Sequence, residues 1–314
     1  MKTFAGSNLG RVLSAGQFAV TAEVGPPRGP DPAEVKKKAG VLRGVADAYN
    51  VTDNQTAVVR MSSIAASKVL LQEGLEPVMQ IVCRDRNRIA IQSDLLGAWA
   101  LGLRNVLCLS GDHQSAGAGG KLHGHPGAKN VYDIDSIQLI RIVKGLGDGA
   151  IQEGGDSISP AAPFLIGAAW TPLGPPEKFR TIRLAKKINA GADFIQTQAV
   201  YDIKRFAEAI RRAEDMGLTD KAAILPGIII PRSAGMLRYM DANVPGIVVP
   251  DEMIQRMKDA ADPKAEGIKI TLELVDAIKN LSGIKGVHLQ AIEAEGLLPD
   301  VIKAAGLLPR PHVY

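Results

Sequence analysis

The sequence predicts one (β/α)8 TIM barrel, an α/β fold in which eight parallel strands alternate with helices. Three observations lead to this prediction. Eight short apolar runs alternate with longer segments of helical periodicity along 314 residues. The short runs are continuously apolar, which is typical of parallel strands covered by helices. No linker or break in composition divides the chain, so we expect residues 1–314 to form a single barrel domain rather than an open doubly wound sheet.

The predicted strands are the short runs that are rich in apolar and β-branched residues. They lie at residues 18–24 (FAVTAEV), 46–52 (ADAYNVT), 77–82 (PVMQIV), 105–110 (NVLCLS), 164–170 (FLIGAAW), 194–200 (FIQTQAV), 223–230 (AILPGIII) and 286–292 (GVHLQAI). Eight such units in a chain of this length fit a closed barrel.

The predicted helices are the amphipathic stretches between these runs. The clearest lie at residues 87–101, 134–145, 177–190 and 204–216. We expect Asp133 to cap the second of these, and Pro175 and Pro176 to begin the third. Residues 244–257 could start as a ninth strand, but we interpret them as a loop that enters a helix after the seventh strand.

The composition narrows the class of protein. Hydrophobic residues make up 46% of the chain, and 37 basic against 33 acidic residues leave a net charge of +4, which gives little reason to expect a nucleic-acid partner. Two cysteines, Cys83 and Cys108, without CxxC spacing exclude a disulfide scaffold and a cysteine-built metal centre within this chain. The first twenty residues lack the apolar core of a signal peptide, and no run reaches the ~18 apolar residues of a membrane helix. We therefore expect a soluble, cytoplasmic protein that does not insert into membranes.

Polar residues gather where the predicted strands end. In a barrel of this class the chemistry lies at the carboxyl ends of the strands. For any one such residue, capping of the next helix is the simpler interpretation. Five strands that all supply polar groups at one end indicate a site, and these groups are Glu23, Thr52, Asp53, Asn54, Gln80, Ser110, Gly111, Asp112, Gln196 and Gln198.

Glu23 is the predicted catalytic residue. It lies on an apolar strand, and burial raises the pKa of a carboxyl group, which suits a general acid working near neutral pH. The alternative is an ion pair with Arg28 or another base across the barrel. Asp112 is the second candidate carboxylate, and Gly111 before it would let the backbone approach a ligand closely. The glutamines Gln196 and Gln198 have the donors and acceptors to match the amide edge of a flavin or pterin ring.

Other motifs carry less weight. Residues 117–122 (GAGGKL) resemble a phosphate-binding loop but lack its Ser or Thr, and residues 145–150 (GLGDGA) follow a helix pattern, so we expect a helix end and a turn there. His113, His123 and His125 lie close together without an acidic or cysteine partner at ligand spacing. We therefore expect no metal site, although one of these histidines could contact a phosphate or ribose of a cofactor.

Seven motifs in order then make the chain resemble a known family. They are AEVGPPRG (22–29), VTDN (51–54), QIVCRDRNR (80–88), LGLRNVLCLSGD (101–112), YDIDSIQLI (132–140), KKINAGADFIQTQAVYD (186–202) and LPGIIIP (225–231). Together they resemble the methylenetetrahydrofolate reductase family, single barrels that bind FAD, and the resemblance runs from about residue 17 to about residue 295.

The resemblance implies a reaction and three residue roles. The reaction is reduction of 5,10-methylenetetrahydrofolate to 5-methyltetrahydrofolate, a step of one-carbon metabolism and methionine biosynthesis. Glu23 matches the acid that protonates N10, after which the flavin hydride reduces the methylene carbon. Asp112 matches the aspartate that contacts folate and flavin, where a carboxylate favours the developing cation. Gln198 matches the glutamine that binds folate and nicotinamide in turn.

The resemblance also implies a flavin site. Residues matched to flavin contacts are Thr52, Asp53, Gln55, Gln80, Ser110, Gly111, Asp112, Tyr132, Asp133 and Trp170, with Arg180, Arg183, Lys186 and Lys187 near the flavin phosphates. The chain departs from the family at several of these positions. Ser110 replaces an arginine, Gln80 a histidine and Trp170 a tyrosine, while Glu293 replaces an arginine associated with substrate. The expected electron donor is NAD(P)H or a partner electron-transfer subunit, and an oligomer is expected.

Three alternatives stay open at this point. One is another flavin barrel oxidoreductase, such as a proline dehydrogenase, although the ring-opening acid Glu23 counts against it. The second is a catalytically silent subunit that keeps the fold, against which Glu23, Asp112 and Gln198 together argue. The third is direct hydride transfer from NADH without flavin, which the changes at Ser110 and Gln80 allow and which a colourless but active protein would reveal.

Overall fold

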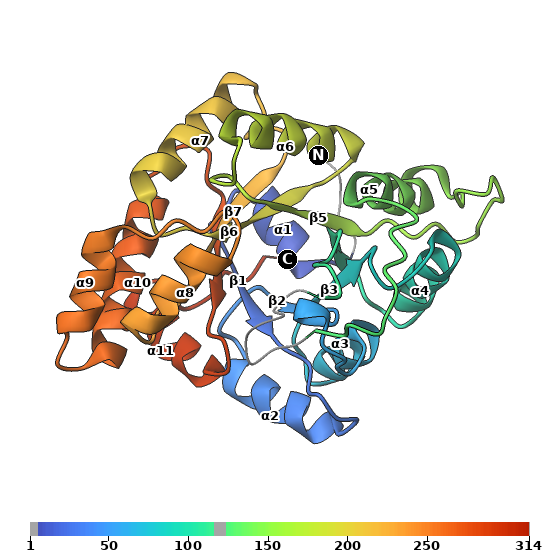
Figure 1. The fold of residues 1–314 in the computed structure, drawn as a ribbon. Coiled ribbons are helices and arrows are strands. Elements are labelled where there is room, and N and C mark those ends of the chain that lie inside the picture. The colour runs from blue at the N-terminus through green and yellow to red at the C-terminus, as the bar shows by residue number, and fades with distance from the viewer. Residues whose placement is uncertain (1–5, 116–123, 314) are drawn as a thin grey trace.

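A computed structural model describes residues 6–115 and 124–313, and it confirms the closed barrel of eight parallel strands (Figure 1). The strands run in chain order around the barrel, and the last pairs with the first, Ala19 lying opposite Gly286. They are β1 (Ala19–Val24), β2 (Ala48–Val51), β3 (Pro77–Val82), β4 (Asn105–Leu109), β5 (Leu165–Trp170), β6 (Phe194–Ala199), β7 (Ala223–Ile229) and β8 (Gly286–Gln290). Each lies within the strand predicted for it.

Helices surround the barrel. They are α1 (Asn8–Ser14), α2 (Pro32–Leu42), α3 (Ser63–Gln72), α4 (Arg88–Ala100), α5 (Ser136–Lys144), α6 (Glu177–Ala190), α7 (Ile203–Asp215), α8 (Ala234–Asn243), α9 (Asp251–Asp259), α10 (Pro263–Lys279) and α11 (Leu298–Ala304), with 3-10 turns η1 (Gln55–Ala57) and η3 (Glu295–Leu297). Side chains such as Asp31, Asn87 and Asp262 cap them by accepting backbone N–H groups.

The predicted cap of α5 was wrong. Asp135, not Asp133, begins this helix: its side chain accepts the N–H groups of Ile137 and Gln138, and Gln138 closes the capping box. Asp133 lies outside the helix and pairs with Arg88. At the other end, α5 continues into the π-helical turn η2 (Gly145–Gly149), so the Gly-rich motif there is a helix end.

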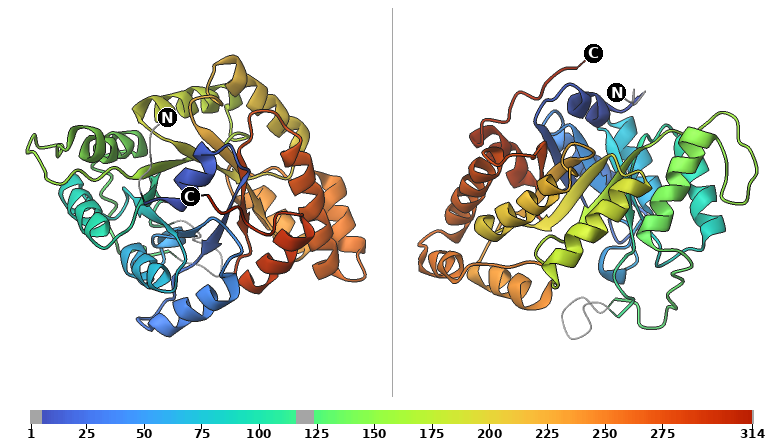
Figure 2. Two further views of the ribbon diagram at one scale, coloured as in Figure 1. Left: turned by 180° about the vertical axis from the view of Figure 1, so that it is seen from behind. Right: turned by 90° about the horizontal axis from the view of Figure 1, so that it is seen from above.

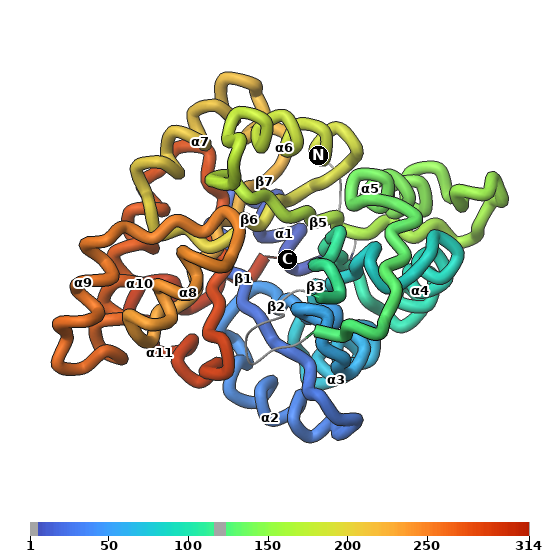
Figure 3. The backbone as a smooth tube through the Cα atoms, in the orientation of Figure 1, coloured from blue at the N-terminus to red at the C-terminus, as the bar shows by residue number. Residues whose placement is uncertain are grey.

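Three helices, α8, α9 and α10, lie between β7 and β8, where a simple β/α unit has one. Residues 244–250 form a loop between α8 and α9, as predicted, and α10 then returns the chain to β8. Figure 3 shows α8, α9 and α10 side by side on one flank of the barrel. The unit is longer than the others because α8 and α9 are added before the helix that packs on β7 and β8.

The amino ends of the strands are closed by α1 and the C-terminal segment (Figure 2). The N–H groups of Asn8 and Leu9 donate to Glu76, which precedes β3, and Ser7 bonds to Asn105 at the start of β4. The Arg11 guanidinium donates to the carbonyl of Val313. Both ends of the described chain therefore lie at the amino ends of the strands, away from the end of the barrel where the strands' carboxyl ends meet.

The barrel interior is layered. Near the amino ends lies an apolar cluster of Leu9 and Val12 from α1 with inward residues such as Leu107 and Phe194. Gly167 makes room for Phe194, since a Cβ there would lie 2.3 Å from its ring. A polar layer of Thr21, Asn50, Gln196 and His288 follows. Above it the interior opens into a cavity.

No helix in residues 6–115 and 124–313 is both long enough and apolar enough to cross a bilayer.

Candidate active site

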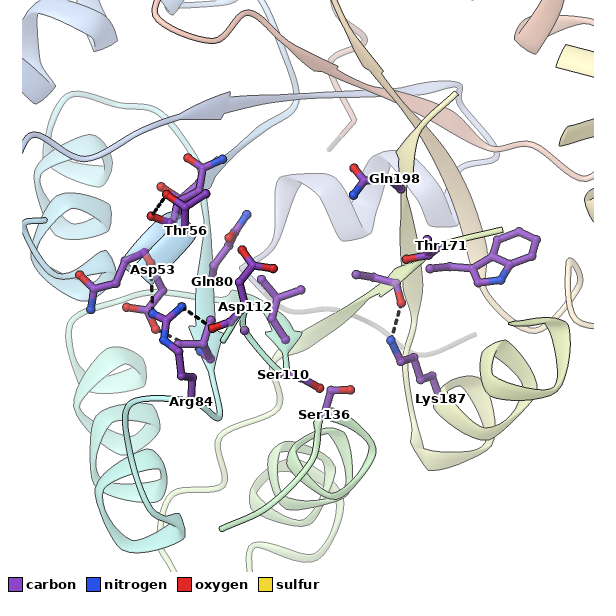
Figure 4. Close-up of a pocket in the computed structure, with 18 of the residues that line it drawn as sticks. Asp53, Thr56, Gln80, Arg84, Ser110, Asp112, Ser136, Thr171, Lys187 and Gln198 are labelled. Atoms are coloured by element: carbon purple, nitrogen blue, oxygen red, sulfur yellow. Dashed lines mark hydrogen bonds between the residues drawn. The ribbon is translucent and has the colours of Figure 1, made fainter. Parts of the chain in front are cut away.

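A cavity of about 400 Å³ opens at the carboxyl ends of the strands, where the site was predicted. Most of the predicted site residues line it: Glu23, Thr52, Asp53, Gln55, Gln80, Ser110, Gly111, Asp112, Trp170, Arg180, Arg183, Lys187 and Gln198. In Figure 4 the side chains from the ends of β2, β3 and β4 face those of Gln198, Thr171 and Lys187 across it. Tyr132, Asp133 and Lys186 do not line it.

Glu23 lies near the end of β1, partly buried at the cavity wall. Its Oε2 accepts a hydrogen bond of 2.9 Å from the Nε2 of Gln290 on β8. No ion pair joins Glu23 to a basic side chain among residues 6–115 and 124–313, so the alternative of a pair with Arg28 was wrong. Burial raises the pKa of Glu23 to about 7, while the Gln290 hydrogen bond acts in the opposite direction. A carboxyl group in this state gives and takes a proton near neutral pH.

The Asp53 side chain is held by hydrogen bonds within the protein. Its carboxylate accepts two hydrogen bonds from Arg86, at 2.7 and 3.2 Å, and one from the backbone N–H of Val82 at 3.1 Å. It therefore ties the end of β2 to β3. The neighbouring Thr52 differs, because its buried Oγ1 has no hydrogen-bond partner among the described residues and lies at the cavity wall. A hydroxyl buried in this way is free to bond a ligand.

The loop after β2 is strained. Asn54, Thr56 and Ala57 all have positive φ values, of 44°, 55° and 58°. Non-glycine residues in this region cost about 1–3 kcal/mol each and gather at ligand-binding loops. The segment that carries Gln55 to the cavity is thus held in place by its surroundings.

Arg84 is a cavity residue that the sequence analysis missed. Its buried guanidinium pairs with Asp85 at 2.6 Å and donates to the carbonyls of Asn54 and Asp112, each at 3.1 Å. It thus joins the loops after β2 and β4 (Figure 4). The available signal was an arginine two positions after the end of the predicted third strand, in the motif QIVCRDRNR.

Gly111 is required by packing within the protein. Its φ is +87°, and a Cβ at this position would lie 3.0 Å from the Cβ of Val82 and 3.1 Å from that of Arg84. The close approach expected at Gly111 is therefore made to Val82 at the end of β3 and to Arg84 in the loop beyond it. Asp112 then extends to the exposed rim of the cavity.

Tyr132 and Asp133, both predicted flavin contacts, do not line the cavity. The Tyr132 hydroxyl donates to the Gly111 carbonyl at 3.0 Å and so supports the loop after β4. Asp133 pairs with Arg88 at 2.9 Å. In this structure both residues brace loops, and neither is part of the cavity lining.

One face of α6 brings cations to the cavity. Arg180, Arg183 and Lys187 follow helical spacing and line the wall, whereas Lys186 points away and is exposed. Arg180 bonds to the carbonyls of Gly174 and Pro175, and the ammonium of Lys187 bonds to that of Ala169. Burial and the neighbouring Arg183 lower the pKa of Lys187 to about 8. These cations can hold an anionic group such as a phosphate.

The paired glutamines of β6 lie at different depths. Gln198 lines the cavity, but Gln196 is buried below it and forms a reciprocal amide pair with Asn50. The prediction that Gln196 belongs to the site was therefore wrong. Gln80 on β3 does reach the cavity, and its amide points into it (Figure 4).

The described residues contain no group of three His, Cys, Asp or Glu side chains that could hold a metal ion. His113 bonds to Ser115, and neither it nor His125 lines the cavity. The motif at 117–122 and His123 lie outside the described residues.

Comparisons with known protein sequences all point to one family. The family model described as methylenetetrahydrofolate reductase matches residues 8–306. A probable methylenetetrahydrofolate reductase (NADPH) of Caenorhabditis elegans is 26% identical over 268 residues, which cover 81% of this chain and 36% of that protein. Methylenetetrahydrofolate reductase 2 of Schizosaccharomyces pombe is 29% identical over 269 residues, which cover 79% and 38%. The chain thus spans less than two fifths of the length of these relatives.

Solved structures share the fold. A protein from Clostridium thermocellum, described as binding two copies of 5-methyl-5,6,7,8-tetrahydrofolic acid, superposes with a TM-score of 0.64 at 14% identity, covering 94% of this chain and 98% of that one. A 2,3-dimethylmalate lyase superposes with a TM-score of 0.51 at 12% identity, covering 99% and 91%. At these identities the likeness concerns the fold alone.

Proposed function

This chain belongs to the methylenetetrahydrofolate reductase family, and on that basis we propose that it reduces 5,10-methylenetetrahydrofolate to 5-methyltetrahydrofolate as one barrel domain. The observation that carries the proposal is Glu23, an acid with a pKa of about 7 that faces a cavity also lined by the amide side chains of Gln80 and Gln198. The Clostridium thermocellum protein of the same fold, described as binding 5-methyltetrahydrofolic acid, supports a folate ligand.

Glu23 would act as the general acid. Its proton passes to N10 of the substrate, the bond between N10 and the methylene carbon breaks with its electron pair going to N10, and an iminium cation forms at N5. Asp112 at the rim favours that cation electrostatically. Gln198, on the wall opposite Asp112 in Figure 4, has both a donor and an acceptor for the pterin ring.

The cavity residues fit FAD. Thr52 presents an unpartnered hydroxyl, Gln80 and Ser110 present polar groups, and the α6 cations suit the phosphates. When bound, FAD supplies the hydride that reduces the methylene carbon, and NAD(P)H or a partner electron-transfer subunit renews it. Cys83 and Cys108 are buried free thiols, in keeping with the proposed cytoplasmic setting.

The test is an absorbance spectrum of the purified protein, followed by anaerobic addition of NADH and then methylenetetrahydrofolate. We expect flavin bands that bleach with NADH and return with the folate. Glu23→Gln should slow the return at least a hundredfold, because the acid is lost, while leaving the bleaching nearly unchanged.

Other outcomes separate the alternatives. Bands that ignore NADH but return with folate after chemical reduction would indicate a partner subunit as electron donor. A colourless protein that still turns over would show direct transfer from NADH, and a protein without any turnover would be a silent subunit. Folate turnover that survives Glu23→Gln would contradict the assignment of the acid.

A further inference from the structure

Side chains of the neighbouring strands β1 and β8 contact each other at two positions inside the barrel, two residues apart along each strand. Thr21 lies opposite His288 in the strand register, and Thr21 Oγ1 lies 2.9 Å from His288 Nδ1. Two residues further along each strand, Gln290 donates to Glu23 at the same distance. The Gln290 backbone carbonyl also accepts the N–H of Ile230, the residue that follows β7. Gln290 is therefore held opposite Glu23 by the sheet itself.

This geometry distinguishes the two oxygens of Glu23. A protonated carboxyl group has one hydroxyl and one carbonyl oxygen. The carbonyl oxygen is the stronger acceptor of the two, so the N–H of Gln290 favours the state in which Oε2 is the carbonyl oxygen. In that state the proton lies on Oε1.

We propose that Gln290 is the positioning residue of the acid: its amide holds Oε2 of Glu23 so that the proton is carried on Oε1 and delivered from there. The inference rests on the proposed function, since it concerns how the acid of that reaction is oriented. After the proton has passed to the substrate nitrogen, the same N–H stabilises the carboxylate that remains. Reprotonation of Oε1 returns the acid to its starting state.

The charged groups near Glu23 do not hydrogen-bond to it, so its orientation depends on the neutral side chain of Gln290. Glu295 from η3 raises the pKa of Glu23 and Lys38 from α2 lowers it, and these two form an ion pair of 2.6 Å with each other. The other charged cavity residues come from the loops after β2, β3 and β4 and from α6: Asp53, Arg84, Asp112, Arg180, Arg183 and Lys187. Replacement of Gln290 by an apolar residue removes the donor without changing any charge.

The experiment compares Gln290→Met and Gln290→Glu with wild type and with Gln17→Met, a glutamine exposed at the other end of the barrel. The first readout is the pH dependence of flavin reoxidation by methylenetetrahydrofolate. The second is the pKa of Glu23 itself, from carboxyl carbon NMR of glutamate-labelled protein, with Glu23→Gln identifying the signal.

Loss of the donor should raise the pKa of Glu23 by about 0.5–1 pH unit in Gln290→Met, because a hydrogen bond to the ionised form is removed. Gln290→Glu should raise it further through like-charge repulsion. The rate with protonated acid should fall roughly tenfold in Gln290→Met, since the carboxyl group is no longer oriented. Gln17→Met should behave as wild type.

Two results would overturn the proposal: an unchanged pKa of Glu23 in both variants, or a pH profile of reoxidation that does not move. The NMR readout needs no turnover. Shifted NMR titrations in a protein that never reduces methylenetetrahydrofolate would contradict the proposed function and leave the pairing of Gln290 with Glu23 intact.

Discussion

Glu23 and Asp53 are carboxylates at the ends of neighbouring strands, yet their surroundings give them different tasks. Asp53 is neutralised by the two hydrogen bonds from Arg86 and serves to join β2 to β3. Among the described residues, the side-chain hydrogen-bond partner of Glu23 is the neutral amide of Gln290. A buried carboxyl group without a hydrogen-bonded cation changes its protonation state near neutral pH, and for this reason we propose Glu23, rather than Asp53, as the acid.

The burial of Glu23 makes the free energy of unfolding depend on pH. The pKa of Glu23 is raised from 4.5 to about 7 in the folded protein, so the folded state binds more protons than the unfolded state between these values. The free energy of unfolding should therefore fall as pH rises from 4.5 to 7. Glu23→Gln removes the cost of ionising a buried carboxyl group in the folded state. We therefore expect this variant to be more stable than wild type at pH 8 by on the order of 2–3 kcal/mol.

Urea unfolding of wild type and Glu23→Gln at pH 5 and pH 8 measures the effect. At pH 5 the two proteins should differ little, because most of the acid is protonated in the folded state. Glu208→Gln, at an exposed position of α7, is the control and should change stability by less than about 0.5 kcal/mol at both values. An equal effect of Glu23→Gln at pH 5 and pH 8 would show that its ionisation is not linked to folding.

The elements of the fold were largely predictable from the sequence, whereas the depth of single side chains was not. The eight strands were found because each is a continuous buried run between helices. Gln196 and Gln198 could not be separated, because residues two apart on a strand point to the same side, and only the closed barrel shows which lies deeper. The cap of α5 was missed by two residues, since Asp133 and Asp135 both precede the same apolar run.

The role of Arg84 was hidden for a related reason. A long side chain reaches carbonyl groups on loops from two other strands, and no spacing in the sequence encodes that contact. Tyr132 likewise acts through a hydroxyl that reaches Gly111, 21 positions earlier in the chain. The cavity wall is thus made by contacts between loops, while the strands only bring those loops together.

The loop after β4 depends on Gly111. In Gly111→Ala the new methyl group would lie 3.0 Å from the Val82 Cβ, in a backbone conformation of φ +87° that alanine disfavours. We expect a loss of about 1–3 kcal/mol in the free energy of unfolding. The displaced loop should also weaken flavin binding at least tenfold, because Ser110 and Asp112 flank this position.

Gly154→Ala is the matched control, since a Cβ there meets no atom within 4 Å. It should leave both unfolding and flavin titration unchanged. If Gly111→Ala bound flavin with wild-type affinity, the loop after β4 would not be part of the cofactor site.

The last described residues of the chain contact the segments that begin the first two strands. Arg310 pairs with Asp47 at 2.6 Å and also donates to the carbonyl of Phe18, just before β1. Asp47 is almost fully buried and accepts the N–H of Val20. Since β8 also pairs with β1, the start and end of the barrel support each other, and we propose that the chain unfolds as one domain.

Arg310→Met tests this proposal, because it leaves the buried Asp47 without its cation. Removing one partner of such a pair costs about 3–5 kcal/mol, whereas Asp47→Asn in the same protein removes the unpaired charge and should recover part of the loss. Unfolding in urea is followed by circular dichroism and by the fluorescence of the two tryptophans, Trp99 on α4 and Trp170 on β5, neither of which is near Arg310 in the sequence. In a single cooperative domain both signals shift to the same lower midpoint. A fluorescence midpoint that stays at the wild-type value while the dichroism midpoint falls would mean that the sector with β4 and β5 unfolds independently, and the chain would then contain more than one cooperative unit.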